Sequence, residues 1–182
     1  MIIVLTGNPG VGKHTVAEKI TKKLKMELLD INEIVKNSEL FEKNDDAIDV
    51  DVEELEKIIH NKINNPMLIV GHLAPYVIPE EKVDKTIVLR KNPYDLYDIY
   101  KKRQYTRKKS RQNIECEVLG ITAYDSLRKF GKKVFQIDTT RRDVDKVTEL
   151  VLDIMKGSSH NDEVDWLDMI WREKDLEKIF SD

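Results

Sequence analysis

The sequence predicts an α/β fold in which a five-stranded parallel β-sheet carries helices on both faces. Five short apolar runs rich in β-branched residues recur along the chain, at residues 1–6, 26–31, 67–70, 85–90 and 133–138. Segments with apolar residues at helical spacing separate these runs. Such alternation is typical of βαβ units, whose right-handed crossovers give a parallel sheet covered on both faces. Ligands of such sheets bind at the carboxyl ends of the strands.

The first apolar run leads directly into a glycine-rich segment, Gly7-Asn-Pro-Gly-Val-Gly-Lys13. Its spacing, a glycine, four residues and then Gly-Lys, is that of a P-loop. Glycines let the backbone approach a polyphosphate closely, and successive backbone N–H groups form a concave anion site. The helix that follows adds the positive end of its dipole. The sequence therefore predicts a P-loop NTPase, with Lys13 at the β- and γ-phosphates.

The residues that follow Lys13 are predicted to serve the metal ion. P-loops place Ser or Thr directly after the lysine, but here His14 occupies that position and Thr15 follows it. Mg²⁺ prefers oxygen ligands to imidazole. We therefore expect the Thr15 hydroxyl to bind Mg²⁺ and the His14 backbone N–H to bind phosphate.

Further helices are predicted from the spacing of apolar residues. They cover residues 16–24, 32–40, 52–63, 113–130 and 143–155, and one more begins at Asn92-Pro93. Asn32 is the expected N-cap of the second helix, and Pro93 suits a first helical position. A polar, acidic connection is expected over residues 41–51.

Two polar residues follow predicted strands and are candidates for the site. Asp30 ends the second strand, and His72 follows the third. Asp30 is expected either to hold metal-bound water or to cap the next helix. His72 is expected either to be structural or to orient a water molecule or the γ-phosphate.

Residues 101–111 form a strongly basic segment that contains seven Lys and Arg side chains. In a chain that carries a phosphate loop, we interpret this segment as a mobile lid between two helices. Such a lid closes over the triphosphate and excludes water. Arg103 can contact two phosphate oxygens through its planar guanidinium, as lysine cannot. A solvated surface segment and an RNA-binding segment are the alternatives.

The composition favours one soluble domain over residues 1–182. Charged residues make up 36% of the chain, but the net charge is only −3. No general attraction to membranes and no sequence-specific nucleic-acid binding is therefore expected. A single cysteine, Cys116, excludes an internal disulfide, and no signal peptide or membrane span of about 20 residues is visible. We expect a cytoplasmic protein.

The last residues, about 160–182, read as a separate helical tail. Val164, Leu167 and Trp171 recur at helical spacing. Amphipathic terminal helices usually pack on their own domain, which is the expectation here. An exposed partner-binding surface is the alternative.

Together these motifs resemble the adenylate kinase isoenzyme 6 family, P-loop nucleotide kinases also described as ribosome-assembly ATPases. The similar segments are Gly7–Thr15, Ile69–His72, Ile87–Arg90, Arg103–Tyr105, Asn113–Glu117 and Val164–Leu167. They are spread over nearly the whole chain at compatible spacing. The resemblance implies a fold of the nucleoside-monophosphate-kinase type.

The resemblance also implies a function and a set of site residues. It implies that the γ-phosphoryl group of ATP moves to AMP, with weak ATP hydrolysis. Hydrolysis in the family is tied to late small-subunit (16S rRNA) maturation through transient binding of the ribosomal protein uS11. The triphosphate is expected at Gly10, Gly12, Lys13, His14 and Thr15. The resemblance also implies a lid at about residues 102–112 that brings Arg103 to ATP. The acceptor is expected to lie against about residues 30–53. His72 is expected to be a catalytic residue, together with Lys13 and Arg103.

Three positions depart from the family pattern. Val70 stands where the family has an acidic residue, His14 replaces a hydroxyl residue, and Lys36 stands where arginine is common. Two alternative functions are an assembly factor whose nucleotide cycle is a switch and a shikimate-type kinase of small metabolites. The latter favours an arginine cluster for the acceptor carboxylate, and residues 30–51 contain no arginine.

Overall fold

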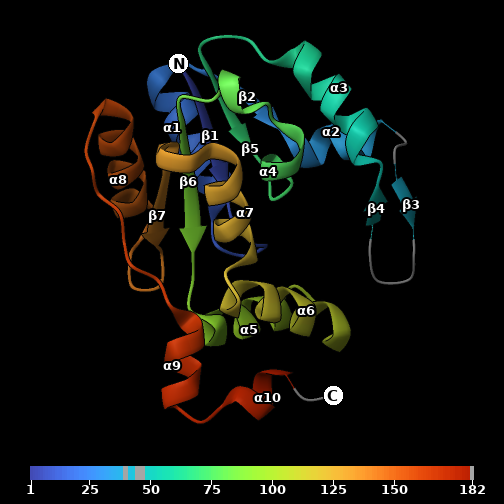
Figure 1. Cartoon of the computed structure of the whole chain (residues 1–182), viewed down its shortest axis with the longest axis vertical. Coiled ribbons are helices and arrows are strands. Elements are labelled where there is room, and N and C mark those ends of the chain that lie inside the picture. Colours follow the sequence, from blue (N-terminus) through green and yellow to red (C-terminus); the bar gives the residue numbers. More distant parts are fainter. Residues whose placement is uncertain (39–40, 44–47, 181–182) are drawn as a thin grey trace.

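The computed structural model describes residues 1–38, 41–43 and 48–180, and it has the predicted α/β architecture. The main sheet consists of β1 (Ile2–Thr6), β2 (Glu27–Asp30), β5 (Met67–Val70), β6 (Lys85–Arg90) and β7 (Val134–Asp138). Neighbouring strands are parallel, in the spatial order β2-β5-β1-β6-β7 (Figure 1). The strand that leads into the phosphate loop therefore lies at the centre of the sheet.

Alternate residues of each strand face two separate hydrophobic cores. In β1, Ile3 and Leu5 belong to one core, whereas Ile2 and Val4 belong to the other. The first core is closed by α1 (Lys13–Leu24) and α8 (Val144–Lys156), and the second by α3 (Val52–Lys62), α4 (Ala74–Val77) and α7 (Ile121–Phe130). Burial on both faces explains why the strands read as continuous apolar runs.

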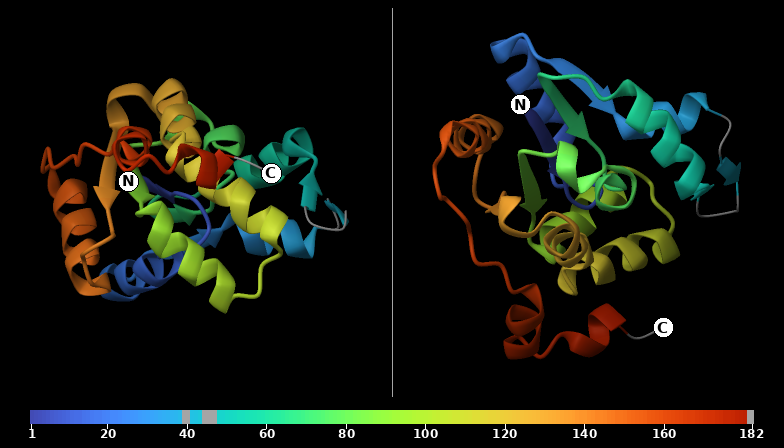
Figure 2. Two further views of the ribbon diagram at one scale, coloured as in Figure 1. Left: turned by 90° about the horizontal axis from the view of Figure 1, so that it is seen from below. Right: turned by 45° about the horizontal axis from the view of Figure 1, so that its top comes forward.

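The remaining helices gather at the carboxyl ends of the strands. They are α5 (Pro93–Lys102), α6 (Arg107–Val118), α9 (Trp166–Arg172) and α10 (Leu176–Phe180). Both tail helices contact α6 and lie at the same end of the molecule as α5 (Figures 1 and 2). Ile170 and Ile179 are buried in the first core. The tail therefore packs on the domain through Ile170 and Ile179, whereas Leu167 and Trp171, two residues of the predicted apolar stripe, are exposed.

The segment between the second and third predicted helices differs from expectation. Instead of an irregular connection it contains an antiparallel pair, β3 (Phe41–Lys43) and β4 (Ile48–Val50). Strands of three residues are too short for their alternation to stand out in a sequence. The helix before them, α2 (Ile31–Asn37), ends earlier than the predicted residue 40, although residues 39–40 lie outside the described part of the chain.

The predicted N-cap of α2 is also wrong. Asp30, not Asn32, precedes the helix, and its Oδ1 accepts a hydrogen bond from the Asn32 backbone N–H at 2.8 Å. Asp and Asn are about equally good caps. The difference arises because β2 runs directly into the helix, so the chain turns at Asp30.

The helix predicted over residues 113–130 is two helices in the structure. α6 begins at Arg107, within the basic segment, and α7 begins after Gly120, whose φ is 65°. Only the turn at residues 103–106 separates α5 from α6, so most of the basic segment is helical. The break is stabilised from outside, because Arg90 Nη2 donates to the Glu117 carbonyl at 2.8 Å.

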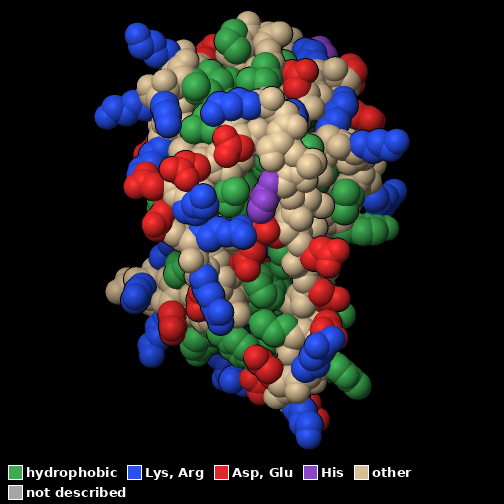
Figure 3. Space-filling view, turned by 90° about the vertical axis from the view of Figure 1, so that its left-hand side faces the viewer, with side chains coloured by type: hydrophobic (Ala, Val, Ile, Leu, Met, Phe, Trp, Pro, Cys, Tyr) green, Lys and Arg blue, Asp and Glu red, His purple; other side chains and the backbone are tan. Residues whose placement is uncertain are grey.

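Acidic and basic side chains are interspersed on the face of the molecule drawn in Figure 3. This distribution agrees with the small net charge of −3. Hydrophobic side chains gather lower on this face, at the level of the tail helices. Among the described residues, no helix combines the length and the apolar character that a membrane crossing needs.

The buried position of β5 gives a prediction about stability. Leu68 is fully buried, so Leu68→Ala should lower the free energy of unfolding by about 2–5 kcal/mol through lost contacts and a cavity. Leu24→Ala, at a position in α1 that is 43% exposed, should change it by less than about 1 kcal/mol. Urea unfolding followed by circular dichroism measures both values. Equal losses would contradict the assigned core.

Candidate functional site

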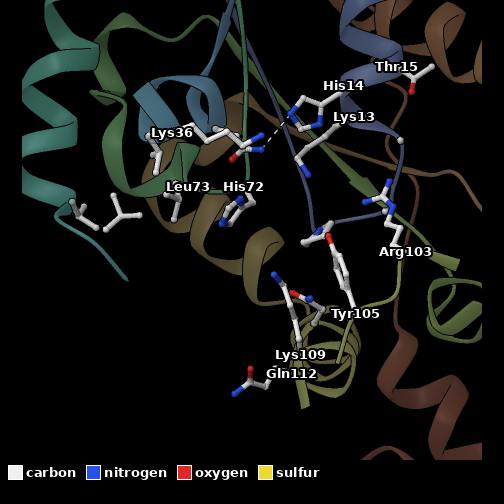
Figure 4. Close-up of a pocket in the computed structure, with 18 residues that line it drawn as sticks. Lys13, His14, Thr15, Lys36, His72, Leu73, Arg103, Tyr105, Lys109 and Gln112 are labelled. Carbon is white, nitrogen blue, oxygen red and sulfur yellow. Dashed lines mark hydrogen bonds between the residues drawn. The ribbon is translucent and has the colours of Figure 1, made fainter. Parts of the chain in front are cut away.

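A pocket of about 530 Å³ lies beside the phosphate loop. The phosphate loop and the start of α1 form one wall. The opposite wall consists of α2, together with Val50, at the end of β4, and Val52, at the start of α3. His72 and Leu73, after β5, and residues of the 103–113 segment complete the lining (Figure 4). The volume is in the range typical of small-molecule sites. The predicted phosphate loop, acceptor segment and lid therefore all contribute to one cavity.

Close packing gives the phosphate loop its shape. A Cβ on Gly7 would overlap the Leu89 carbonyl oxygen, and one on Gly10 would lie 3.2 Å from the Tyr100 ring. Both glycines have positive φ values, 137° and 89°. The Tyr100 hydroxyl donates to the Pro9 carbonyl at 2.6 Å. The glycines are therefore required by sterics as well as by ligand approach, and α5 supports the loop from below.

Lys13 is buried at the centre of the site, with a side chain only 4% exposed. Its Nζ donates to the Asn8 backbone carbonyl at 3.2 Å. Burial, and next the charge of Arg103, lowers the pKa of Lys13 to about 8, while Asp30 and Glu117 oppose the shift. Lys13 and Arg103 both line the pocket, so the positive charge of Arg103 acts on Lys13. A bound polyphosphate would relieve the repulsion between these two cations.

His14 connects the phosphate loop to the opposite wall of the pocket. Its Nε2 lies 3.1 Å from Asp30 Oδ2 and 3.3 Å from Asn32 Nδ2. Burial acts to raise the pKa of Asp30, but the hydrogen bond and charge of His14, with backbone N–H groups, hold it below its usual range. Of the two roles expected for Asp30, the helix cap is confirmed. Its carboxylate also pairs with the residue that replaces the usual hydroxyl.

The predicted metal ligands offer oxygen donors of the right kind. Thr15 is exposed and lines the edge of the pocket, apart from Lys13 and His72 in Figure 4. In the described part of the chain, no three His, Cys, Asp or Glu side chains are grouped as a metal site. Mg²⁺ in nucleotide sites takes one or two protein oxygens and completes its shell with phosphates and water. Thr15 and Asp30 supply a hydroxyl and a carboxylate of this kind, but Asp30 does not line the pocket, and its two oxygens already pair with the Asn32 N–H and His14.

His72 faces the pocket from the end of β5. His72 is exposed to solvent at the mouth of the pocket. Partial desolvation there, and then the charges of Lys13 and His14, lower its pKa to about 4. His72 is therefore neutral at pH 7 and is suited to hydrogen bonding rather than to charge neutralisation. Val70, at the position where an acidic residue was expected, is buried beside Asp30 in the register of β5 and β2.

Sequence reasoning gave no role to several residues that shape the site. Tyr105 stacks on Tyr100, with ring centroids 5.3 Å apart, and Lys109 Nζ lies 4.8 Å from the Tyr105 centroid. Tyr105 and Lys109 both line the pocket. A tyrosine within a run of cations was the available signal, since aromatic faces attract such groups. The side chains that bind Glu117, those of Asn8, Arg90 and Trp166, could not be predicted from a local pattern, because they are far apart in the sequence.

Comparison with known proteins shows the family. A family model described as an AAA domain matches residues 3–120. A Methanocaldococcus jannaschii protein named "Putative adenylate kinase" is 34% identical, over 91% of this chain and 93% of its own. A Methanosarcina barkeri protein of the same name is 31% identical, over 93% and 100% respectively. Both relatives therefore match more than nine tenths of this chain.

Solved structures share the fold at lower identity. A shikimate kinase from Bacteroides thetaiotaomicron superposes with a TM-score of 0.60 and 16% identity, covering 86% of this chain and 98% of that one. YorR from Bacillus subtilis, in complex with phosphorylated GDP, superposes with a TM-score of 0.62 and 18% identity, covering 86% of this chain and 96% of that one. These likenesses support the fold alone. By its closer relatives, the chain belongs to the archaeal adenylate kinase family of P-loop, AAA-domain proteins.

Proposed function

We propose that this protein transfers the γ-phosphoryl group of ATP to AMP and so forms two molecules of ADP. One observation carries the proposal: a single pocket joins a triphosphate wall, with Lys13 and Arg103, to a second wall that bears Lys36. Two nucleotides bound to these walls would meet between them, as direct phosphoryl transfer requires. The relatives' name, "Putative adenylate kinase", supports the same reaction.

The residues of the triphosphate wall would act by positioning and charge neutralisation, the main demands of phosphoryl transfer. The loop N–H groups and Lys13 would hold the β- and γ-phosphates. Arg103 would contact the transferring group from the lid, at about residues 102–112. Mg²⁺, when bound, neutralises charge on these phosphates, and the Thr15 hydroxyl, with Asp30 through water, would hold it.

The acceptor needs no general base, because the AMP phosphate is itself the nucleophile. A neutral His72 would instead orient the acceptor or a water molecule through a hydrogen bond. Its role should therefore matter most in hydrolysis, when water replaces AMP. The acceptor would lie against residues in the 30–53 segment, of which Lys36 is the cation in the pocket wall.

A second candidate function is that of an assembly ATPase whose nucleotide cycle controls a partner. The family resemblance suggests uS11 and late small-subunit (16S rRNA) maturation. The observation that favours a partner is the exposure of Leu167 and Trp171, which are four residues apart and share one side of α9. In this case kinase turnover would be incidental.

A test of the proposed function is ADP formation from ATP and Mg²⁺ with AMP, CMP, UMP, shikimate or no acceptor. We expect a strong increase with AMP. Lys13→Ala should lower kcat/KM by about 10³-fold, because it removes the cation at the β- and γ-phosphates. Lys19→Ala, at the exposed side of α1, should keep full activity as a matched control.

Two outcomes would contradict this assignment. If Lys13→Ala keeps more than about a tenth of the activity, Lys13 does not have the role given to it. A slow rate that is independent of the acceptor would favour the assembly ATPase, and a nucleotide-dependent pull-down with uS11 would then decide between hydrolysis alone and a partner-coupled switch.

Lys36 tests the acceptor wall separately. Lys36→Ala should raise KM for AMP by about tenfold, through loss of a charge-assisted contact, and leave KM for ATP unchanged. Lys36→Arg should lower KM for AMP below the wild-type value, because guanidinium can contact two phosphate oxygens. Steady-state kinetics with each substrate varied in turn measure the effects. Equal changes in both KM values would place Lys36 outside the acceptor site.

The lowered pKa of Lys13 predicts how ATP affinity depends on pH. Below pH 8 the amine is charged in both free and bound protein, so its contribution is constant. Above a pKa of about 8 the free protein loses this proton, and binding must take it up again. Kd for a non-hydrolysable ATP analogue should then rise toward about tenfold per pH unit. Calorimetry should show a flatter profile for Lys13→Arg, which stays charged; identical profiles would contradict the assignment.

A further inference from the structure

Glu117 is a buried carboxylate with partners from distant parts of the chain. Its side chain is 1% exposed. The carboxylate accepts hydrogen bonds from Asn8 Nδ2 (2.7 Å), Arg90 Nε (2.8 Å), Trp166 Nε1 (3.0 Å) and the Lys91 backbone N–H (3.1 Å). A buried charge is tolerated only with such pairing. We call Asn8, Arg90, Glu117 and Trp166 the Glu117 cluster.

The cluster reaches the phosphate site through Asn8. The Asn8 side chain is held at both ends, because Nδ2 donates to Glu117 and Oδ1 accepts from Thr122 Oγ1 at 3.1 Å. The backbone carbonyl of the same residue accepts from Lys13 Nζ at 3.2 Å. Glu117 therefore holds Asn8 in position, and Asn8 in turn holds Lys13 of the phosphate loop.

The tail contributes to the cluster through Trp166, the first residue of α9. The Arg90 guanidinium already neutralises the charge of Glu117. The hydrogen bond from the neutral Trp166 indole N–H therefore orients the carboxylate and adds no charge. The preceding linker is tied to the sheet by Asp162, which accepts from Asp138 N–H at 2.9 Å and pairs with Arg142. The tail is thus held to the domain before Trp166, by Asp162, and after it, by the buried Ile170 and Ile179, and this places Trp166 at Glu117.

We propose that Trp166 and Glu117 are positioning residues through which the docked tail sets the triphosphate site. Trp166 orients the Glu117 carboxylate, Glu117 orients Asn8, and Asn8 places Lys13 for the β- and γ-phosphates. The tail is then part of the ATP-binding machinery, and loss of its contact weakens ATP binding without affecting the AMP wall. This inference rests on the proposed function only in taking the loop as the ATP site.

The test is Trp166→Phe in the full chain, which removes the indole N–H and keeps an aromatic side chain. We expect Kd for ATP, measured by calorimetry, to rise about fivefold, the change that corresponds to the net contribution of one ordinary hydrogen bond. KM for AMP should stay within about twofold of wild type. Trp171→Phe is the matched control, because Trp171 lies in the same helix but is 67% exposed; it should change neither value.

A second variant separates positioning from general destabilisation. Asn8→Ala should also raise Kd for ATP, and the Asn8→Ala, Trp166→Phe double variant should show less than the product of the single effects, because both act along one chain of contacts. Multiplicative effects, or equal Kd values for Trp166→Phe and Trp171→Phe, would overturn the inference while the wild type still binds and transfers phosphate. Failure of the wild type to bind ATP would overturn the proposed function itself.

Discussion

The Glu117 carboxylate lies where the phosphate loop, the end of β6, α6 and the tail meet, and the burial of its charge constrains all four. Arg90 supplies the opposite charge, while Asn8, Trp166 and the Lys91 backbone N–H donate further hydrogen bonds to the carboxylate. Removing any donor would leave a buried acceptor incompletely paired, which is costly in a low-dielectric interior. The conformation of the phosphate loop therefore depends on contacts from both ends of the chain.

The pocket concentrates positive charge, which favours the binding of an anion. Lys13, Arg103, Lys36 and Lys109 all line it. The cost of this arrangement is visible in Lys13, whose pKa is lowered to about 8 mainly by burial and then by Arg103. Nucleotide phosphates would offset that cost, so the electrostatic gain on binding comes partly from relief of repulsion. His72, kept neutral, adds no further positive charge at pH 7.

The features that the sequence predicted correctly are those with strong local signals. The five main strands were predictable because two-sided burial leaves uninterrupted apolar runs, and the phosphate loop because its glycines follow from close packing against Leu89 and Tyr100. Features with weak local signals were missed or misplaced. The three-residue strands β3 and β4 are examples, and so is the expectation that Asn32 caps α2, although capping was one of the two roles expected for Asp30. The break at Gly120 is another, since one glycine in a helical pattern does not by itself end a helix.

By itself, the sequence determined the class of this protein: a parallel α/β sheet, a phosphate loop at the end of its first strand and a basic segment suited to polyphosphate. These are local properties, because periodicity and motif spacing are set by residues close together in the chain. Only the tertiary structure decided that His14 pairs with Asp30, that Lys13 and Arg103 line one pocket and that Trp166 reaches Glu117. Each of these arrangements joins residues brought together by the folding of the sheet and the docking of the tail, so no spacing rule along the chain could have predicted them.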